Sequence, residues 1–213
     1  MKINTIFYSI QGEGPLIGVP MIFIRTSGCN LKCTKETVGF DCDTSYHIEG
    51  KDMTQDEIIK EVQSYDCNNI CITGGEPSIQ KKRINSLIYK LHSLNYKVQI
   101  ETNGSLKHLS TFLDCIIVCS PKYNIQMKKW MFHKDNEFIE QTFKFVYTNN
   151  GKEILEFVVK YNIEEKDIYI MPEGIDRKTL IKNSIKTVEF CKKYGFKFSP
   201  REHIMIWNIQ RGV

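Results

Sequence analysis

Short apolar runs alternate with longer amphipathic segments along most of the chain. The apolar runs are rich in Ile, Val and Phe, and turn residues separate them, which is typical of buried strands. They predict strands at residues 5–9, 21–26, 69–73, 97–101, 115–119, 142–147, 167–171 and 197–199.

The amphipathic segments predict four helices between these strands. Residues 54–65 open with Thr54 followed by Glu57, the spacing of a capping box. A second helix has an apolar stripe at i, i+3, i+4 and i+7, formed by Ile84, Leu87, Ile88 and Leu91. Residues 152–161 and 176–194 complete the set, and Gly195 is the expected cap of the last helix.

Strands that alternate with helices predict an α/β fold with a parallel sheet. Glycine-rich and polar motifs follow the strands at Gly74, Thr102, Ser120 and Pro172. Such sheets build their sites at the carboxyl ends of their strands. The strands are too few for a complete eight-fold barrel, so we expect an incomplete, partly open (β/α) barrel. Without repeats or linkers, we expect one domain over residues 1–213.

Composition narrows the function classes. The net charge of +4 over 213 residues is too mild to indicate a nucleic-acid-binding protein. The first residues lack the apolar core of a signal peptide, and no run is long enough to span a membrane. We therefore expect a cytoplasmic protein, in which eight cysteines indicate metal binding or burial rather than disulfides.

Three of the cysteines lie in one polar loop, at Cys29, Cys33 and Cys42. Three thiolates would leave one iron of a four-iron cluster open for another ligand. A structural zinc site would need a fourth protein ligand, for which His47 or Cys67 is the candidate. The remaining cysteines, Cys71, Cys115, Cys119 and Cys191, lie in apolar segments where burial is expected.

With the turn Gly74-Gly75-Glu76-Pro77, the cysteine trio resembles the radical S-adenosylmethionine (SAM) superfamily. Further motifs narrow the resemblance to the 7-carboxy-7-deazaguanine synthase family of the queuosine pathway, and it covers about residues 5–210. These motifs are the turn at residues 7–14, Cys42-Asp43-Thr44, Thr73, Glu101-Thr102-Asn103-Gly104 and Ser120-Pro121-Lys122.

The resemblance implies an enzyme that contracts the ring of 6-carboxy-5,6,7,8-tetrahydropterin to 7-carboxy-7-deazaguanine, with loss of ammonia. A [4Fe–4S] cluster and SAM would generate a 5′-deoxyadenosyl radical that takes hydrogen from C6, so no side chain is assigned as catalytic. The resemblance also implies Mg²⁺ held by Thr44, a reductant such as flavodoxin or ferredoxin, and a homodimer. It implies neither a nucleic-acid partner nor a membrane.

The resemblance assigns the site residues by motif. The cluster ligands are Cys29, Cys33 and Cys42. The SAM-binding residues are Asp43, Gly75, Glu76, Ser120, Pro121, Lys122, Met171, Pro172 and Glu173. The substrate-binding residues are Ile10, Gln11, Gly12, Glu13, Arg25, Thr73, His203 and Val213. Arg201, which stands where the family has a different pattern, is our own candidate for gripping the substrate carboxylate.

Two departures and two alternatives remain open. Eight residues separate Cys33 from Cys42, whereas the common pattern of the superfamily has two. Asp41 precedes Cys42 at a position where that pattern usually has an aromatic residue. A glycyl-radical activase has a similar trio but acts on a protein, whereas Arg25 and the turn at residues 10–14 suit a small acidic heterocycle. A zinc-stabilised binding module without catalysis is the alternative of another class.

Overall fold

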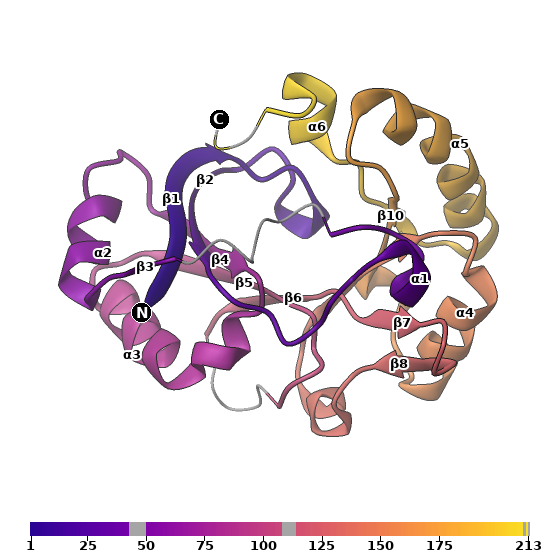
Figure 1. Ribbon diagram of the computed structural model, residues 1–213, viewed down its shortest axis with the longest axis horizontal. Helices are drawn as coiled ribbons and strands as arrows, with labels where there is room; N and C mark the ends of the chain where they lie inside the picture. Colours follow the sequence, from indigo (N-terminus) through magenta and orange to yellow (C-terminus); the bar gives the residue numbers. More distant parts are fainter. Residues whose placement is uncertain (43–49, 108–113, 211, 213) are drawn as a thin grey trace.

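The computed structural model describes residues 1–42, 50–107, 114–210 and 212. Within them, nine strands form one curved sheet in the order β11-β10-β9-β6-β5-β4-β2-β1-β3 (Figure 1). The strands of this sheet are β1 (Lys2–Ile10), β2 (Pro20–Thr26), β3 (Lys51–Asp52), β4 (Asn69–Gly74), β5 (Lys97–Thr102), β6 (Ile116–Cys119), β9 (Thr142–Tyr147), β10 (Ile168–Pro172) and β11 (Lys197–Phe198). Two more, β7 (Lys122–Asn124) and β8 (Lys129–Met131), form a separate hairpin.

All strand pairs from β2 across to β11 are parallel. β1 is antiparallel to β2, because a connection as short as residues 11–19 cannot make the crossover that parallel strands need. β1 is also antiparallel to β3 on its other side. The two edge strands, β3 and β11, do not pair with each other in the described part of the chain. The sheet is therefore a partly open barrel, which confirms the predicted fold class.

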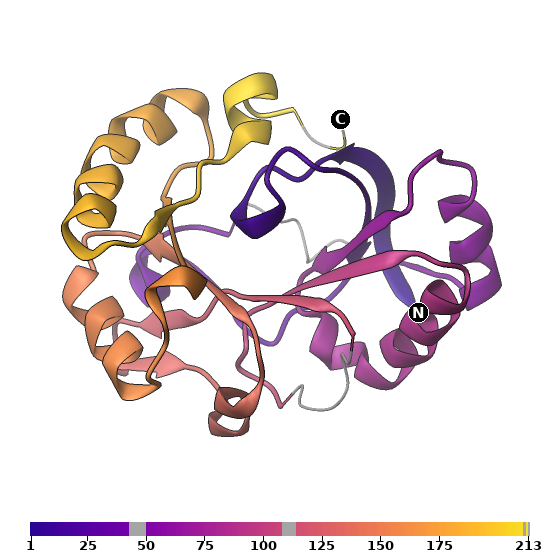
Figure 2. The ribbon, with the colours of Figure 1, turned by 180° about the vertical axis from the view of Figure 1, so that it is seen from behind.

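The described helices are α1 (Lys35–Val38), α2 (Gln55–Val62), α3 (Lys81–Ser93), α4 (Gly151–Lys160), α5 (Arg177–Tyr194) and α6 (Glu202–Trp207). The four longer ones cover the outer face of the curved sheet, whereas α1 and α6 are short and belong to loops (Figure 1). Figures 1 and 2 show α2 and α3 outside one half of the barrel, and α4 and α5 outside the other half. Each half has its own apolar core between helices and sheet.

Strand alternation separates an apolar outer face from a more polar inner face. On β4 and β5, Ile70, Ile72, Val98 and Ile100 pack outward in the core with α2 and α3. Their neighbours Cys71, Thr73, Gln99 and Glu101 point the other way, toward the inside of the barrel. The polar residues of these strands therefore gather where α/β barrels place their ligands.

The second core is dominated by aromatic rings. Trp130 on β8 lies with its ring centroid 5.4 Å from Phe145 and 5.0 Å from Phe157, and its indole nitrogen donates to the Glu153 carbonyl at 3.0 Å. Phe132 joins the same cluster, 5.3 Å from Phe157. Both residues serve packing.

Most predicted elements are present with small shifts of their ends. Thr54 and Glu57 form the predicted capping box, Gly195 ends α5 in the left-handed conformation, and α3 buries the predicted stripe. No prediction covered α1, α6, β3 or the β7–β8 hairpin. These elements are short, and β3 exists only because it pairs with the start of β1.

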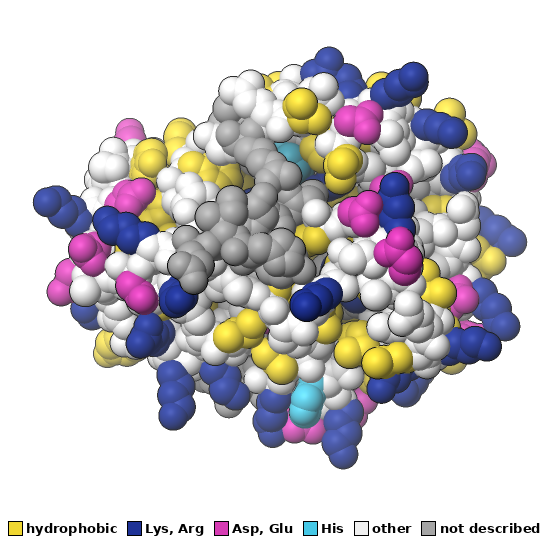
Figure 3. All heavy atoms as spheres, in the orientation of Figure 1, with side chains coloured by type: hydrophobic (Ala, Val, Ile, Leu, Met, Phe, Trp, Pro, Cys, Tyr) yellow, Lys and Arg dark blue, Asp and Glu magenta, His cyan; other side chains and the backbone are white. Residues whose placement is uncertain are grey.

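The surface carries mixed charges. On the face shown in Figure 3, Lys and Arg side chains lie around the rim with Asp and Glu between them. Exposed pairs such as Lys90–Asp56, at 3.0 Å, and Lys192–Glu189, at 2.9 Å, lie on helix surfaces. The lysine-rich helices thus present ordinary solvated faces. None of the helices in the described ranges is long and apolar enough to cross a lipid bilayer.

Candidate active site

Four loops at the carboxyl ends of the parallel strands touch one another in sequence. The Glu76 N–H, after β4, donates to the Gly28 carbonyl, after β2, at 2.8 Å. The Asn103 N–H, after β5, donates to the Glu76 carboxylate at 2.7 Å, and the Ser120 N–H, after β6, donates to the Thr102 carbonyl at 2.7 Å. The motifs that were predicted to share one edge of the sheet therefore do so.

The glycine turn after β4 packs directly against the cysteine loop. A Cβ atom added to Gly75 would lie 1.9 Å from the Gly28 carbonyl oxygen, an atom of the backbone that cannot move independently. The Gly75 N–H also donates to the Thr26 carbonyl at 3.2 Å. Only glycine allows this approach, which fixes the loop that begins at Cys29.

The residues between Cys33 and Cys42 form a short helix, α1. Helix α1 starts after Thr34, whose side chain and backbone are both bonded to Thr37 in a capping box. Gly39 ends the helix in the left-handed conformation, and the Cys42 N–H then donates to the Cys33 carbonyl at 3.2 Å. This short helix therefore allows the backbone of Cys42 to lie next to that of Cys33.

Lys122 lies beside these thiols. Its ammonium group donates to the carbonyl and the hydroxyl of Ser120 at 2.7 and 2.6 Å. Burial lowers the pKa of Lys122, while the nearby Cys33 and Cys42 oppose this shift. The lysine thus places a cation next to the group of cysteines, and Pro121 beside it is buried.

Glu76 is fully buried and uses its carboxylate inside the protein. One oxygen accepts from the Ser78 N–H at 2.9 Å and from the Thr102 hydroxyl at 2.7 Å, and the other accepts from the Asn103 N–H. The side chain that was predicted to bind SAM therefore ties the turn after β4 to the loop after β5.

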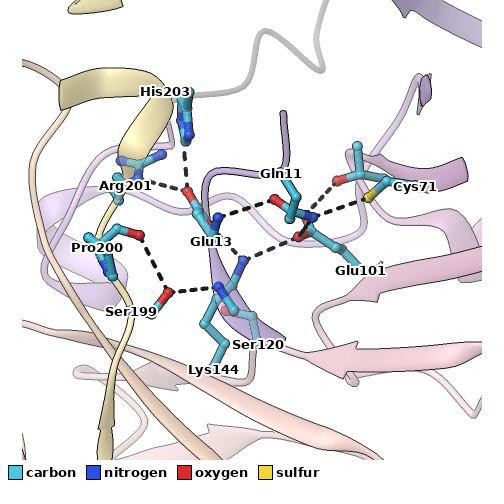
Figure 4. A network of polar contacts seen from close by, with 12 residues as sticks. Gln11, Glu13, Cys71, Glu101, Ser120, Lys144, Ser199, Pro200, Arg201 and His203 are labelled. Carbon is cyan, nitrogen blue, oxygen red and sulfur yellow. Dashed lines mark hydrogen bonds and ion pairs between the residues drawn. The ribbon is translucent and has the colours of Figure 1, made fainter. Parts of the chain in front are cut away.

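A network of opposite charges lies in the mouth of the barrel (Figure 4). Lys144 on β9 forms ion pairs with Glu13 at 2.5 Å and with Glu101 at 3.4 Å, and only 5% of its side chain is exposed. Arg201 approaches the other oxygen of Glu13 at 2.8 Å. Two carboxylates and two cations from four distant segments therefore meet here.

The opposite charges in this network keep Glu13 and Lys144 ionised. Burial by itself would raise the pKa of Glu13, but attraction by Lys144 and Arg201 holds this pKa well below its ordinary value. Burial by itself would lower the pKa of Lys144, but Glu101 and Glu13 raise it above the usual lysine range. Glu13 and Lys144 are therefore both charged at neutral pH.

Neutral side chains extend the network along the inner face of the sheet. The Gln11 amide donates to Glu101 at 3.4 Å, and its oxygen accepts from the Glu13 N–H at 3.2 Å. The Thr73 hydroxyl donates to the second oxygen of Glu101 at 3.0 Å. Three predicted substrate residues, Gln11, Glu13 and Thr73, thus lie around Glu101 and Lys144, which sequence reasoning did not assign.

The C-terminal segment closes over the turn at residues 10–14. The Glu202 N–H donates to the Gly12 carbonyl at 3.0 Å, and a Cβ atom on Gly12 would lie 2.1 Å from His203 Nδ1. His203 Nε2 also lies 3.9 Å from the Glu13 carboxylate. The predicted positions of Gly12, Glu13 and His203 are therefore adjacent, although they are about 190 residues apart in sequence.

The other predicted residues take different positions. The Arg25 guanidinium lies 6.0 Å from the centroid of the Phe7 ring, on the inner face of β2. Ile10 ends β1 next to Gln11, while Met171 and Pro172 end β10 in buried positions. The Glu173 carboxylate accepts from Asn183 on α5 at 2.9 Å, so it turns toward that helix.

Comparison with known proteins decides the family. Residues 23–126 match the model of the Radical SAM superfamily. The 7-carboxy-7-deazaguanine synthase of Hyperthermus butylicus is 34% identical over 97% of this chain and 92% of its own length, and that of Halobacterium salinarum is 31% identical over 98% and 91%. The chain belongs to the 7-carboxy-7-deazaguanine synthase family. The crystal structure of QueE from Escherichia coli shares the fold, with a TM-score of 0.75 and 22% identity over 93% of this chain and 92% of that one.

Membership of the radical SAM superfamily implies a [4Fe–4S] cluster and SAM. The donors present suit such a cluster, because one loop carries three cysteines and the Cys42 N–H bonds to the Cys33 carbonyl, and three thiolates would leave one iron open for another ligand. In the described ranges, no three His, Cys, Asp or Glu side chains are arranged to hold a single metal ion. Thiolates that bind the corners of a cluster lie farther apart than the ligands of one ion, so this finding is compatible with the cysteine trio.

Cys67, Cys115 and Cys191 lie away from the trio, packed against the two apolar cores. Cys67 contacts the Pro20 carbonyl at the start of β2, the opposite end of the barrel, so it cannot be a fourth ligand there. Burial raises the pKa of Cys115 to about 12 and that of Cys191 to about 11, which keeps both thiols protonated. His47 and the predicted site residues Asp43, Thr44 and Val213 lie outside the described residues.

Proposed function

We propose that the chain converts 6-carboxy-5,6,7,8-tetrahydropterin to 7-carboxy-7-deazaguanine, with loss of ammonia. The family relatives carry this product in their names. The observation that supports the proposal most strongly is the charged network of Glu13, Glu101 and Lys144 in the mouth of the barrel (Figure 4). It provides carboxylate and amide acceptors for the N–H groups of a pterin edge.

In this proposal, Gln11, Glu13 and Thr73 bind the heterocycle, and Lys144 keeps the carboxylates ionised and oriented. Arg25 is suited to the substrate carboxylate, since a guanidinium group offers two parallel donors. Arg201, whose Nη1 donates to the Gly174 carbonyl at 2.6 Å and whose Nε faces Glu13, is placed to hold Glu13 rather than the substrate. Its assignment to the substrate carboxylate stays a prediction.

The cluster held by Cys29, Cys33 and Cys42, together with SAM, would supply a 5′-deoxyadenosyl radical. Gly75 gives close backbone access beside the cluster loop, and Lys122 provides a cation near the open position for the carboxylate of SAM. Thr44 is the proposed protein ligand of Mg²⁺, an ion that usually keeps several waters. A flavodoxin or ferredoxin as reductant, and a homodimer, belong to the same proposal.

The test is turnover of the anaerobically reconstituted protein. Incubation with the carboxytetrahydropterin, SAM and a reductant should give the deazaguanine acid, identified by mass, together with released ammonia. The matched control replaces Cys29, Cys33 and Cys42 by serine and should give no product. A wild-type protein with about four irons and four sulfides per chain that consumes SAM but leaves the pterin unchanged would refute the substrate. One zinc without sulfide would refute the cluster.

A further inference from the structure

The Asn103 side chain lies next to Cys29 and has no role in the site described so far. It follows β5 and is 8% exposed. Its side-chain nitrogen lies 3.9 Å from the Cys29 sulfur and 3.2 Å from the Asn30 side-chain oxygen. An amide nitrogen carries two hydrogens, so it can donate one to each of these acceptors.

The orientation of this amide is fixed by its surroundings. The Asn103 side-chain oxygen accepts from the Ser105 N–H at 2.9 Å and from the Ser105 hydroxyl at 2.6 Å. The Asn30 side-chain nitrogen donates to the same hydroxyl at 2.8 Å, which closes a ring of three residues. A flipped amide would place its N–H₂ against the Ser105 N–H, so the nitrogen must face the sulfur.

The backbone of Asn103 is held as well. Its N–H donates to buried Glu76, and the Thr102 hydroxyl, which donates to the same carboxylate, accepts from the Gly104 N–H at 3.1 Å. The Cys29 sulfur also accepts from the Leu31 N–H at 3.5 Å. Among the described residues, the sulfur therefore faces the N–H groups of Leu31 and Asn103, and that of Asn103 belongs to a side chain.

We propose that Asn103 is a positioning residue that donates an N–H···S hydrogen bond to the Cys29 thiolate and raises the reduction potential of the cluster. Reduction adds negative charge that is shared with the ligand sulfurs, and the positive end of an N–H dipole stabilises this charge. Glu76, through its bonds to Thr102 and Asn103, fixes the donor. The inference rests on the proposed cluster at Cys29, Cys33 and Cys42.

The experiment is a potentiometric titration of the reconstituted protein, followed by electron paramagnetic resonance without SAM or substrate. We expect Asn103→Leu to lower the reduction equilibrium constant about tenfold, which for one electron is about 59 mV. Asn103→Asp keeps the shape and the bonds to Ser105 but places a carboxylate oxygen at the sulfur, so its potential should fall further. Asn68→Leu, an exposed asparagine at the opposite end of β4, should titrate like the wild type.

Iron and sulfide content is measured before each titration. A wild-type protein that assembles no cluster refutes the proposed function itself. Cluster-loaded Asn103→Leu and Asn103→Asp variants that titrate together with the wild type refute the inference and leave the proposed function standing. If neither variant assembles a cluster, Ser105→Ala decides, because it removes one of the two donors that orient the amide. A decrease in reduction potential smaller than about 59 mV supports the inference, and an unchanged potential overturns it.

Discussion

Replacing Lys144 by Met should destabilise the protein strongly. The change keeps the length of the side chain but leaves Glu13 and Glu101 without the cation that bridges them at 2.5 and 3.4 Å. Removing one partner of a buried ion pair costs about 3–5 kcal/mol of unfolding free energy. For a chain of this size, that corresponds to a decrease in Tm of about 6–20 °C.

The effect should depend on pH with a definite sign. In the wild type, the pKa of Glu13 is depressed, so its stabilising contribution is present above the unfolded pKa and is lost as pH falls through the folded pKa. In Lys144→Met the pKa of Glu13 rises, because the attraction of Lys144 is gone. Its carboxyl then takes up a proton in milder acid, and the difference in Tm from the wild type should shrink as pH falls from 7.

Thermal unfolding followed by circular dichroism measures this prediction. Lys166→Met is the matched control, because Lys166 pairs with Glu164 at 3.0 Å on the surface, where both side chains are about two-thirds exposed. The double variant Lys144→Met, Glu13→Gln should recover part of the lost Tm. Equal melting of Lys144→Met and the Lys166→Met control at pH 7 would refute the reasoning.

Three further predictions concern the loop, the network and the core. Gly75→Ala should lose most of its iron on reconstitution, since its Cβ would overlap the Gly28 carbonyl; iron content equal to the wild type would contradict this. Arg201→Gln should raise the pKa of Glu13 and so move the acidic limb of the pH profile of substrate affinity to higher pH. An unmoved limb would show that Arg201 does not control the ionisation of Glu13. Phe157→Ala should lower the unfolding free energy by about 3–5 kcal/mol in urea titrations.

The outer half of the fold could be predicted from the sequence because it depends on local patterns. The stripe of α3 and the capping box at Thr54 are set by residues within one or two helical turns of each other. The positions of the loops followed from a general property of parallel sheets, whose carboxyl ends share one edge. Strand β3 lacked such a signal because its pairing with β1 defines it, and the four residues of α1 are too few to show an apolar stripe.

The inner face could be predicted only in part. Lys144 lies between Phe143 and Phe145, and a lone lysine within an apolar strand was the available signal for an inward charge. Its partners Glu13 and Glu101 are 131 and 43 residues away, so the pairing itself could not be inferred. Asn103 was noticed as part of a motif, but its contact with Cys29 depends on how the loops pack.

The charge balance of the network leads to a prediction about the substrate carboxylate. Glu13 and Glu101 carry two negative charges, and Lys144 and Arg201 supply two positive ones, so the network is neutral and offers no surplus cation to an added carboxylate. Arg25 on the inner face of β2 is then the residue that should bind it. We expect Arg25→Gln to raise KM at least tenfold, equivalent to about 1.4 kcal/mol of lost binding energy, while its Tm stays close to that of the wild type. If Arg201→Gln raises KM more than Arg25→Gln at pH 7, the carboxylate binds at Arg201 and the neutral-network argument is wrong.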